Sequence, residues 1–402
     1  MILPKTIKLT PYQLRGVEQG LSQRATYLAW DLGVGKTVTA LTILANRKGP
    51  RLIIGPKMVR DVWRKELLDQ FGQRLLCVGE DRGDSEWVFC HFDILRDWWV
   101  ALRQNKFQCC VVDEIHYIRS KRAKRTVDTQ NAISGIPFRV GLSGSPIVNS
   151  VRDLWPQLHA LQPGIWGSEF EFAQQFAQPE ATEYGWKYAG LSNEDELRLR
   201  LDDIMMIVHK KDVLPDLPPL TRQPVLLDLS PDSANEYRCV EFEMVQILRE
   251  AKRQGKGRAD ALQKLTRQFA QVSKIKLKET KAWLKESAAH TDRLVVWTWF
   301  KETARAGGRL LRKSAEVRVV TGESTIDART RAIGDFEGPS ASHAALVATV
   351  GSLGHGVSIP SARTVVFIDL WWQPTLLLQA EARAHRMTSK QGVNVYYLVA
   401  KD

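Results

Sequence analysis

Short runs of aliphatic and β-branched residues recur along this 402-residue chain, and stretches long enough for helices separate them. The runs are RLIIGP (51–56), LLCVG (75–79), CCVVDE (109–114), FRVGLSG (138–144), LVVWTW (294–299), VRVVTG (317–322), ALVATVG (345–351), TVVFIDL (364–370) and NVYYLVA (394–400). Continuous apolar strands that alternate with helices indicate parallel sheets covered on both faces. The pattern therefore predicts an α/β fold.

The strand runs form two groups, and the segment between them is polar and rich in proline, as a linker should be (KKDVLPDLPPLTRQP). We expect a first domain over 1–214, a linker over 215–224 and a second domain over 225–402. Two stretches do not join the strand pattern. We predict that they are mainly helical, one at about 151–212 and the other at about 231–290.

Composition adds three expectations. With 44% hydrophobic and 25% charged residues, no long apolar run and no signal peptide, the chain is expected to be a globular, cytoplasmic protein, in a bacterial or phage setting. Its five cysteines show no C-x-x-C spacing, so we expect neither zinc nor a disulfide framework, and Cys109 and Cys110 should be buried. The net charge of +12 favours a polyanionic partner, nucleic acid first and anionic membrane second.

The stretch WDLGVGKT (30–37) ends as nucleotide-binding loops end, although the pattern G-x-x-x-x-G-K-[ST] has glycine where this chain has Trp30. TYLAW precedes it as a strand would, and VTALTILANR follows as a helix would. Backbone N–H groups of the loop would surround phosphate oxygens, the lysine would reach the outer phosphates, and the threonine would bind Mg2+. The predicted residues are Gly33, Val34, Gly35, Lys36 and Thr37. The alternative is a plain helix start.

Two carboxylates, Asp113 and Glu114, end the apolar run CCVVDE. A carboxylate at the end of such a strand can hold Mg2+, and a second one beside it can orient and deprotonate the attacking water. His116 would either couple this site to its neighbours or face solvent.

A third cluster is QAEARAHR (379–386), in which Gln379, Arg383 and Arg386 would share one face of a helix. Two arginines on one face can stabilise the charge that develops on a transferring phosphoryl group. Spacing alone would favour a surface helix with solvated arginines.

Together these segments resemble the ordered motifs of superfamily-two helicases, from LTPYQLRGV and WDLGVGKT through LIIGPKMVRDVW, DEIH and LSGSPIVN to QAEARAHR. The spacing from Gly322 through Arg329 to Phe336 fits the same order. The chain is most similar to Swi/Snf-type ATPases. Within them, the segments LVATVGSLGHGVSIPSARTVVFIDLWWQPTLLLQAEARAHR and VNVYYLVAKD resemble the HARP-type annealing-helicase subgroup.

This resemblance implies two RecA-like lobes with ATP in the cleft between them, and hydrolysis of ATP that DNA stimulates and that drives translocation along duplex DNA. It implies that Gln13 reads adenine and that Ser143 and Ser145 link hydrolysis to lobe movement. Gly356 and the loop from Gly351 would lie near both ATP and DNA. The implied cofactors are ATP and Mg2+.

The chain also departs from its family. Relatives have D-E-M-G-L-G-K-T where this chain has Trp30 and Asp31, so glycine is not required at the first position; we expect Trp30 to pack under the loop. RMTS replaces the family's closing R-I-G-Q, so Arg386 would be held differently. We further expect a minimal two-lobe core without bracing helices or targeting domains.

A motor that moves along DNA should contact the phosphate backbone, because reading bases would stall it when the sequence changes. The basic run RSKRAKR directly follows the acidic site; its alternative is a solvated loop. Trp297, Trp371 and Trp372 could stack on bases, but core packing suits their apolar neighbours better. The predicted DNA contacts are Lys57, Arg119, Lys121, Arg122, Lys124, Arg125, Thr298 and Lys301.

The sequence therefore predicts an ATP-dependent double-stranded DNA translocase or remodeller, able to anneal strands or remodel branches, that binds duplex DNA and acts as a monomer. One alternative is a strand-separating DNA or RNA helicase, because DEIH also suits those enzymes. Another is a non-catalytic DNA-binding protein with a decayed ATP site.

Overall fold

The computed structural model describes residues 1–182, 185–188, 190–254, 258–339, 343–353, 357–371, 374–387, 389 and 391–401. The chain divides into two compact units, Met1–Pro215 and Asp216–Asp402. Each unit is built on a parallel sheet, so the predicted α/β fold is confirmed. No helix within these described ranges is long and apolar enough to cross a membrane.

The first unit contains a seven-stranded sheet with the order β3-β4-β2-β5-β6-β1-β9, all neighbours parallel. Its strands are β1 (Ala25–Trp30), β2 (Arg51–Gly55), β3 (Leu76–Cys77), β4 (Trp87–His91), β5 (Cys109–Val112), β6 (Phe138–Ser143) and β9 (Met205–Val208). Its helices are α1 (Pro11–Ser22), α2 (Lys36–Ala45), η1 (Lys57–Val59), α3 (Arg60–Phe71), α4 (Leu95–Gln104), η2 (Ile115–Ile118), α5 (Lys124–Ile133), η3 (Val151–Asp153), α6 (Leu154–Leu161), α7 (Glu169–Phe176), α8 (Glu194–Asp202) and α9 (Lys210–Val213). A separate antiparallel hairpin joins β7 (Pro179–Thr182) and β8 (Gly185–Tyr188).

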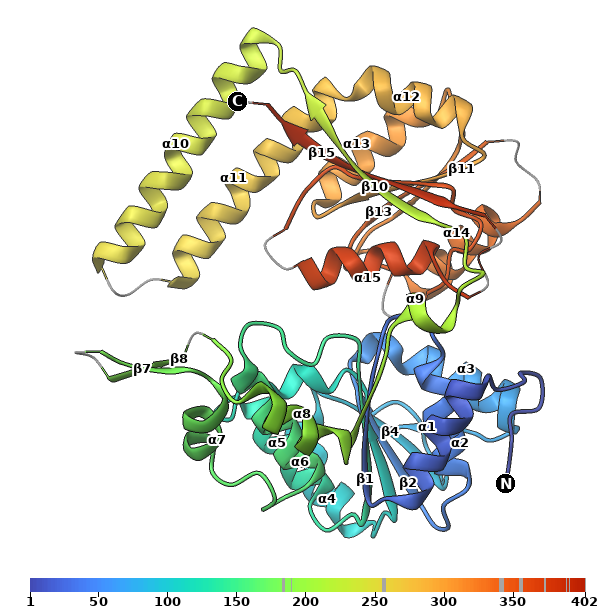
Figure 1. Ribbon diagram of the computed structural model, residues 1–402. Coiled ribbons are helices and arrows are strands. Elements are labelled where there is room, and N and C mark those ends of the chain that lie inside the picture. Colours follow the sequence, from blue (N-terminus) through green and yellow to red (C-terminus); the bar gives the residue numbers. More distant parts are fainter. Residues whose placement is uncertain are drawn as a thin grey trace. The chain divides into compact units, whose positions relative to one another are not determined.

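Both faces of this sheet are covered by helices (Figure 1). The side chains of β1 pack on both sides of the sheet. Tyr27 belongs to the core under α4–α8, whereas Leu28 and Trp30 belong to the core under α1–α3. Side chains alternate between the faces of a strand, so a strand with both faces covered is apolar throughout. All six residues of β1 and all four of β5 are buried.

The second unit has a six-stranded parallel sheet with the order β10-β15-β14-β11-β13-β12. Its strands are β10 (Leu220–Leu227), β11 (Arg293–Thr298), β12 (Glu316–Val320), β13 (Ala344–Thr349), β14 (Thr364–Phe367) and β15 (Val393–Ala400). Its helices are α10 (Pro231–Gln254), α11 (Arg258–Glu279), α12 (Lys281–His290), α13 (Lys301–Leu311), α14 (Ile326–Glu337) and α15 (Pro374–Ala384). Helices α11–α13 cover one face and α14 and α15 the other (Figure 1).

The segment predicted to be mainly helical at 151–212 is only partly so. It also contains the β7–β8 hairpin and β9, which extends the main sheet by pairing with β1 from Tyr27↔Met205 to Trp30↔Val208. The run MMIV of β9 is only four residues long, and pairing with a strand far away in the sequence fixes its conformation. The second predicted helical segment, 231–290, consists of α10, α11 and α12.

The predicted linker over 215–224 is wrong in its second half. Residues from Leu220 onward form β10, which pairs in parallel with β15 over eight residues. Pro224 suggested a linker because proline cannot donate a ladder hydrogen bond, but β10 is an edge strand, where this loss is tolerated. The strand β4 was also not expected.

Candidate active site

The stretch WDLGVGKT forms the turn between β1 and α2. Gly33 and Gly35 have φ angles of 82° and 85°, a left-handed conformation that glycine adopts without a steric penalty. A Cβ atom on Gly35 would also lie 2.2 Å from Nε2 of Gln13. The turn thus directs backbone N–H groups and the start of α2 to one place, as anion binding requires.

Lys36, the first residue of α2, folds back over this turn. Its Nζ donates hydrogen bonds to the carbonyl oxygens of Trp30 at 2.7 Å and Asp31 at 3.0 Å. The ammonium is thereby held above the loop at the carboxyl end of β1. This is the position in which it would meet a phosphate bound by the loop.

Trp30, the last residue of β1, directly precedes the loop and is fully buried. Its ring meets that of Tyr12 edge-on, with 5.5 Å between ring centroids, and a Cβ atom on Gly16 would come within 2.6 Å of it. The indole therefore fills the space between α1 and β1. The packing of Trp30 under the loop itself stays a prediction.

Two side chains of α1 form hydrogen bonds with the backbone of the loop. The hydroxyl of Tyr12 donates to the carbonyl oxygen of Val34 at 3.0 Å, and Nε2 of Gln13 donates to the same oxygen at 3.1 Å. Oε1 of Gln13 accepts from the backbone N–H of Thr10 at 2.9 Å. Gln13, expected to read adenine, lies against the phosphate loop, and sequence reasoning missed Tyr12.

Asp113 and Glu114 follow β5, near the middle of the sheet, and both are buried. Oδ1 of Asp113 accepts from the backbone N–H of Glu114 at 2.9 Å, and Oδ2 accepts from Nε1 of Trp63 at 2.8 Å. Burial and the Glu114 carboxylate raise the pKa of Asp113 to about 6, against the lowering effects of Trp63 and Lys36. The two carboxylates thus lie close together and within the field of the loop lysine.

Glu114 has a left-handed backbone with φ of 49°, which is uncommon for a residue other than glycine. Among the described residues its Oε2 has no hydrogen-bond partner, although Nδ1 of His116 lies 3.3 Å away. A buried carboxylate oxygen without a donor is costly. It is suited to receive a proton from a water molecule that enters the site.

His116 is buried, which excludes the solvent-facing alternative. Its Nδ1 lies 2.9 Å from Oγ of Ser143, and the same Oγ accepts from the backbone N–H of Ser145 at 3.0 Å. β6, which ends at Ser143, lies between β5 and β1. The histidine therefore connects the acidic pair to the LSGSP turn.

The residues at this sheet edge fit a magnesium ion bound together with phosphates. Thr37 and Asp113 offer the hydroxyl and carboxylate oxygens that Mg2+ prefers. Within the described ranges, no group of three or more His, Cys, Asp and Glu side chains could hold a metal ion. Mg2+ usually takes one or two protein carboxylates and completes its shell with phosphate and water.

In the second unit, α15 carries Gln379 and Arg383, and both are buried. The guanidinium of Arg383 lies over the ring of Trp297 at 5.5 Å, and its Nη1 has no hydrogen-bond partner among the described residues. Burial, together with nearby Arg386, lowers the pKa of Arg383 to about 9. Burial thus disfavours the charged form of this guanidinium.

Arg386 does not share the helical face of the other two residues, because α15 ends at Ala384. The backbone N–H of Arg386 donates to Oγ of Ser389 at 3.0 Å, and that hydroxyl donates to the carbonyl oxygen of Ala384 at 2.8 Å. The guanidinium donates to the carbonyl oxygens of Ala382 and Val357. Ser389, part of RMTS, thus turns the chain out of the helix.

The remaining motif residues of the second unit lie in a loop, in the core and at the surface. Arg329 donates to the carbonyl oxygens of Ser324 and Gly322 and so closes the loop after β12, while Phe336 is buried in the core. Gly351 follows β13 and is exposed. Gly356 and Trp372 lie outside the described residues.

The predicted DNA contacts of the first unit lie on its surface. Lys57 is exposed at the start of η1, which leads directly into α3. Within RSKRAKR, Lys121, Arg122 and Lys124 are exposed, while Arg119 and Arg125 are half-buried. Arg125 pairs with Asp93 at 3.3 Å and lies against the rings of Phe92 and Tyr117. The exposed three are the better candidates for phosphate contact.

The position of Thr298 in the second unit does not agree with its predicted contact to DNA. It is fully buried, and its hydroxyl donates to Oδ2 of Asp369 at 2.5 Å, so it supports the core and is not presented to DNA. Lys301 is exposed but pairs with Glu323 at 2.6 Å. Trp297 is buried, as core packing predicts, and Trp371 stacks on Trp299 with 4.6 Å between ring centroids.

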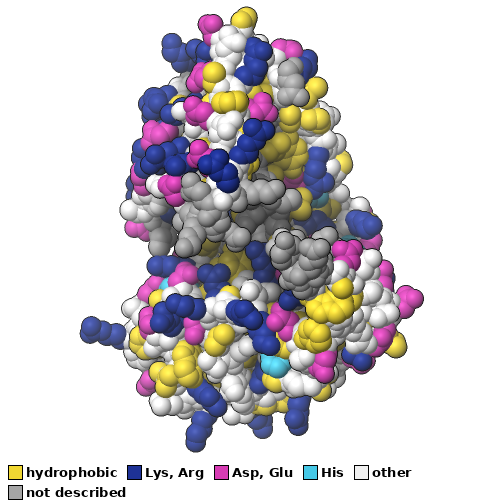
Figure 2. Space-filling model, turned by 90° about the vertical axis from the view of Figure 1, so that its left-hand side faces the viewer, with side chains coloured by type: hydrophobic (Ala, Val, Ile, Leu, Met, Phe, Trp, Pro, Cys, Tyr) yellow, Lys and Arg dark blue, Asp and Glu magenta, His cyan; other side chains and the backbone are white. Residues whose placement is uncertain are grey.

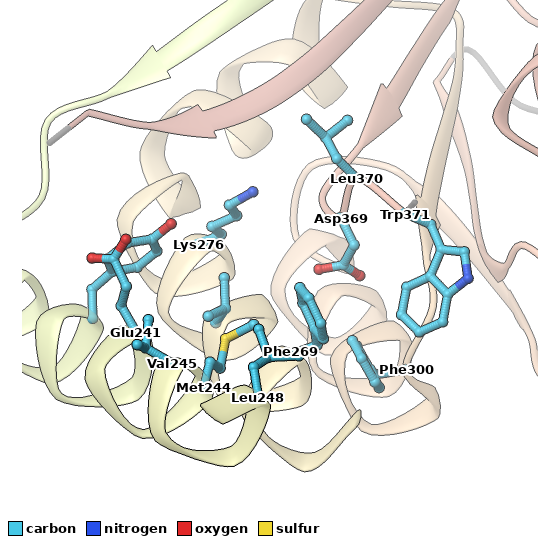
Figure 3. Close-up of a pocket in the computed structure, with 12 residues that line it drawn as sticks. Glu241, Met244, Val245, Leu248, Phe269, Lys276, Phe300, Asp369, Leu370 and Trp371 are labelled. Atoms are coloured by element: carbon cyan, nitrogen blue, oxygen red, sulfur yellow. The ribbon is translucent and has the colours of Figure 1, made fainter. Parts of the chain in front are cut away.

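Asp369 also lines a pocket of about 330 Å³ between α10, α11 and the loops after β11 and β14 (Figure 3). Aromatic side chains of Phe269, Phe300 and Trp371 line one side of it, and Glu241 and Lys276 lie on the other side. Nζ of Lys276 donates to the carbonyl oxygen of Leu398 at 3.0 Å. None of the predicted nucleotide-binding residues lines this pocket.

Basic side chains are also numerous on the side of the second unit where α10 and α11 lie, next to a hydrophobic area (Figure 2). The surplus of 57 Lys and Arg over 45 Asp and Glu residues is therefore not confined to the RSKRAKR segment.

Comparison with known families decides the relationship. Residues 12–287 match the family described as SNF2-related domain, and residues 275–388 match the helicase conserved C-terminal domain. The chain belongs to the SNF2-related family. The first match extends past Pro215, where the first unit ends, and includes α10 and α11.

Relatives of this SNF2-related chain include the DNA annealing helicase and endonuclease ZRANB3 of Mus musculus, 27% identical over 416 residues. The SWI/SNF-related matrix-associated actin-dependent regulator of chromatin subfamily A-like protein 1 of Xenopus laevis is 25% identical over 406 residues. These alignments cover 98% of this chain but only 38% and 42% of the two relatives. The chain thus spans about two fifths of their length.

Among solved structures, the SWI2/SNF2 ATPase core of Sulfolobus solfataricus in complex with dsDNA is similar, with a TM-score of 0.51 and 23% identity. The match covers 100% of this chain and 89% of that chain. It shows that this SNF2-related chain has the same fold, two RecA-like lobes.

Proposed function

We propose that this protein is an ATP-dependent double-stranded DNA translocase or remodeller. One observation carries the proposal. The glycine turn with Lys36 and the carboxylates of Asp113 and Glu114 meet at the carboxyl edge of one parallel sheet, where α/β proteins bind their ligands.

In the proposed reaction, the loop and Lys36 bind the phosphates of ATP. Glu114 orients the attacking water and accepts its proton at the carboxylate, whose Oε2 is buried and has no hydrogen-bond partner among the described residues. Mg2+, when held by Thr37 and Asp113, would neutralise charge on the phosphates. When Glu114 accepts a proton, His116 and Ser143 would transmit this change in charge to the turn after β6.

The second unit would contribute Arg383 and Arg386 as cations that stabilise the transferring phosphoryl group. The buried guanidinium of Arg383 supports this role, because it faces Trp297 and its Nη1 has no hydrogen-bond partner within the described ranges. An arriving phosphate would offer an anion to this cation.

Three observations support duplex DNA as the partner. The exposed Lys57, Lys121 and Arg122 lie on the segments that follow the carboxyl ends of β2 and β5, on the sheet that carries the ATP motifs. The net charge is +12. The name of one relative describes a DNA annealing helicase, and the similar solved structure contains dsDNA.

The decisive experiment measures the rate of ATP hydrolysis with duplex DNA, single-stranded DNA, forked DNA, RNA or no nucleic acid. We expect duplex-containing substrates to stimulate hydrolysis most. Lys36→Ala and Glu114→Gln should still bind DNA but hydrolyse almost no ATP. Exposed Lys48→Ala and Glu18→Gln serve as matched controls. Unchanged turnover in either site variant would refute the assignment.

These ATPase rates, together with a strand-release assay and a DNA-binding assay, distinguish the alternatives. Release of a labelled strand from a fork, or stimulation by RNA alone, would favour a strand-separating helicase. DNA binding by a wild-type protein that hydrolyses no ATP would favour a decayed ATP site.

A further inference from the structure

Trp63, to which no role has been assigned, contacts the acidic site directly. It lies on α3, 50 positions from Asp113 in the sequence, and is fully buried. Its indole Nε1 donates to Oδ2 of Asp113 at 2.8 Å. The indole N–H is the only polar group of this side chain, so the contact is directional.

The contact completes the support of the carboxylate. Oδ1 of Asp113 already accepts from the backbone N–H of Glu114. With the indole on Oδ2, both oxygens are held from fixed directions, and the carboxylate has one preferred rotation. The indole N–H can donate a hydrogen bond but cannot accept one. It therefore favours the ionised form of the Asp113 carboxylate, which is the form that binds a metal ion.

Packing fixes the indole in turn. Trp63 belongs to the core between α3 and the sheet, together with Leu67 of the same helix and Ile53 of β2. The Cβ atom that Gly55 lacks would stand 3.2 Å from Cβ of Asp113, so a larger residue there would crowd the carboxylate. The fold thus holds donor and acceptor in a single arrangement.

We propose that Trp63 is a positioning residue, whose indole N–H holds the Asp113 carboxylate in the orientation that binds the metal ion of the metal–nucleotide complex. The role rests on the proposed function, since it concerns the same ATP site. Partners that orient metal ligands typically contribute about 10- to 100-fold in metal affinity or activity.

The test compares wild-type protein with Trp63→Phe, which keeps an aromatic ring but loses the N–H. Mn2+ replaces Mg2+, and electron paramagnetic resonance measures its binding in the presence of a non-hydrolysable ATP analogue. We expect Mn2+ to bind about 10-fold more weakly in the variant. Binding of the analogue without metal should be unchanged.

Trp166→Phe is the matched control. Trp166 is also buried in the first unit, and its Nε1 donates to Oε1 of Gln162 at 3.0 Å, away from the acidic pair. Should both variants lower thermal stability alike and leave Mn2+ affinity at the wild-type value, Trp63 is only a core residue and the proposal is overturned.

A second variant addresses loss of folding in Trp63→Phe. Placing 3-benzothienylalanine at position 63 keeps the bicyclic shape and replaces N–H by sulfur. Weaker Mn2+ binding there supports the role, and wild-type binding overturns it.

A double-mutant cycle with Asp113→Asn isolates the contact. If Trp63 acts through Asp113, Trp63→Phe causes no further loss of Mn2+ affinity in the Asp113→Asn background. Independent, additive losses overturn the proposal. A wild-type protein that binds no Mn2+–nucleotide would overturn the proposed function itself, and the role of Trp63 with it.

Discussion

The carboxylate of Asp31 accepts a hydrogen bond from the backbone N–H of Lys210, with 2.8 Å between Oδ2 and the nitrogen. Asp31 follows β1 in the phosphate loop, and Lys210 begins α9, the last helix before the boundary at Pro215. The backbone N–H of Asp31 also donates to the carbonyl oxygen of Val208. The nucleotide loop is therefore tied to the segment that leads out of the first unit.

We predict that Asp31→Ala separates ATP hydrolysis from movement on DNA. Lys36 donates to the backbone carbonyl oxygen of Asp31, which the substitution keeps, so ATP hydrolysis should continue. The loss of the side-chain acceptor at the start of α9 costs about 1 kcal/mol. The ratio of translocation rate, by triplex displacement, to ATPase rate should fall. Asp31→Asn, which keeps an acceptor oxygen, should preserve the ratio. Equal ratios in all three proteins would contradict the prediction.

We predict that Asp113→Asn abolishes ATP hydrolysis but stabilises the protein. Burial and Glu114 raise the pKa of Asp113 to about 6, so the folded state binds a proton more readily than the unfolded state. Stability from this group is fully present below the unfolded pKa near 3.8 and is lost as the pH rises through about 6. Asparagine does not ionise, so the Asp113→Asn variant should not lose this stability as the pH rises.

The expected gain is on the order of 1 to 3 kcal/mol at pH 7.5 and smaller at pH 5. Thermal unfolding of both proteins at the two pH values measures it. Asp84→Asn, at an exposed position, should show no such difference. A variant less stable than wild type at pH 7.5 would show that the hydrogen bonds of Asp113 outweigh its burial.

Trp30→Asp should destabilise the first unit and weaken ATP binding. The change removes a fully buried indole and leaves a carboxylate among Tyr12, Gly16 and α2. The expected loss is at least about 3 kcal/mol, as for other buried tryptophans. Chemical denaturation and titration with a fluorescent ATP analogue measure the two effects. Trp30→Phe should retain most of both properties; unchanged values in Trp30→Asp would rule out packing under the loop.

Reversal of the exposed charges in RSKRAKR should weaken DNA binding without affecting ATP hydrolysis in the absence of DNA. The double change Lys121→Glu and Arg122→Glu replaces two cations that are candidates for binding phosphates. The slope of log affinity against log salt should decrease by about 1 for each cation that binds a phosphate in the wild-type protein. Lys48→Glu provides the control. Identical salt dependence would assign the segment to a solvated loop.

The sequence was most informative where local patterns determine structure. The runs around β1, β5 and β6 are mostly apolar, because parallel strands covered on both faces have few polar positions, so their alternation with helices predicted the fold. The turn at Gly33 and Gly35 needs left-handed backbone, and that requirement is visible as glycine.

What could not be predicted depends on contacts between distant residues. β9 is a strand because β1 lies beside it, and β10 includes Pro224 because it is at a sheet edge. Thr298 was predicted to contact DNA, but it is buried, and its hydroxyl donates to a carboxylate 71 positions away in the sequence. Trp63 has no local pattern that distinguishes it from any core tryptophan.

The pairing of β10 with β15 affects how the protein is made. Thr221 and Asn394 face each other although they are 173 positions apart, and β10 has no other strand partner among the described residues. During synthesis, the strands of the first unit can find their partners before the second unit has emerged from the ribosome. β10 has no strand partner among the described residues until β15 is made. Pro224 and Arg222 on this waiting strand would discourage pairing with another chain, so they protect the nascent protein from aggregation.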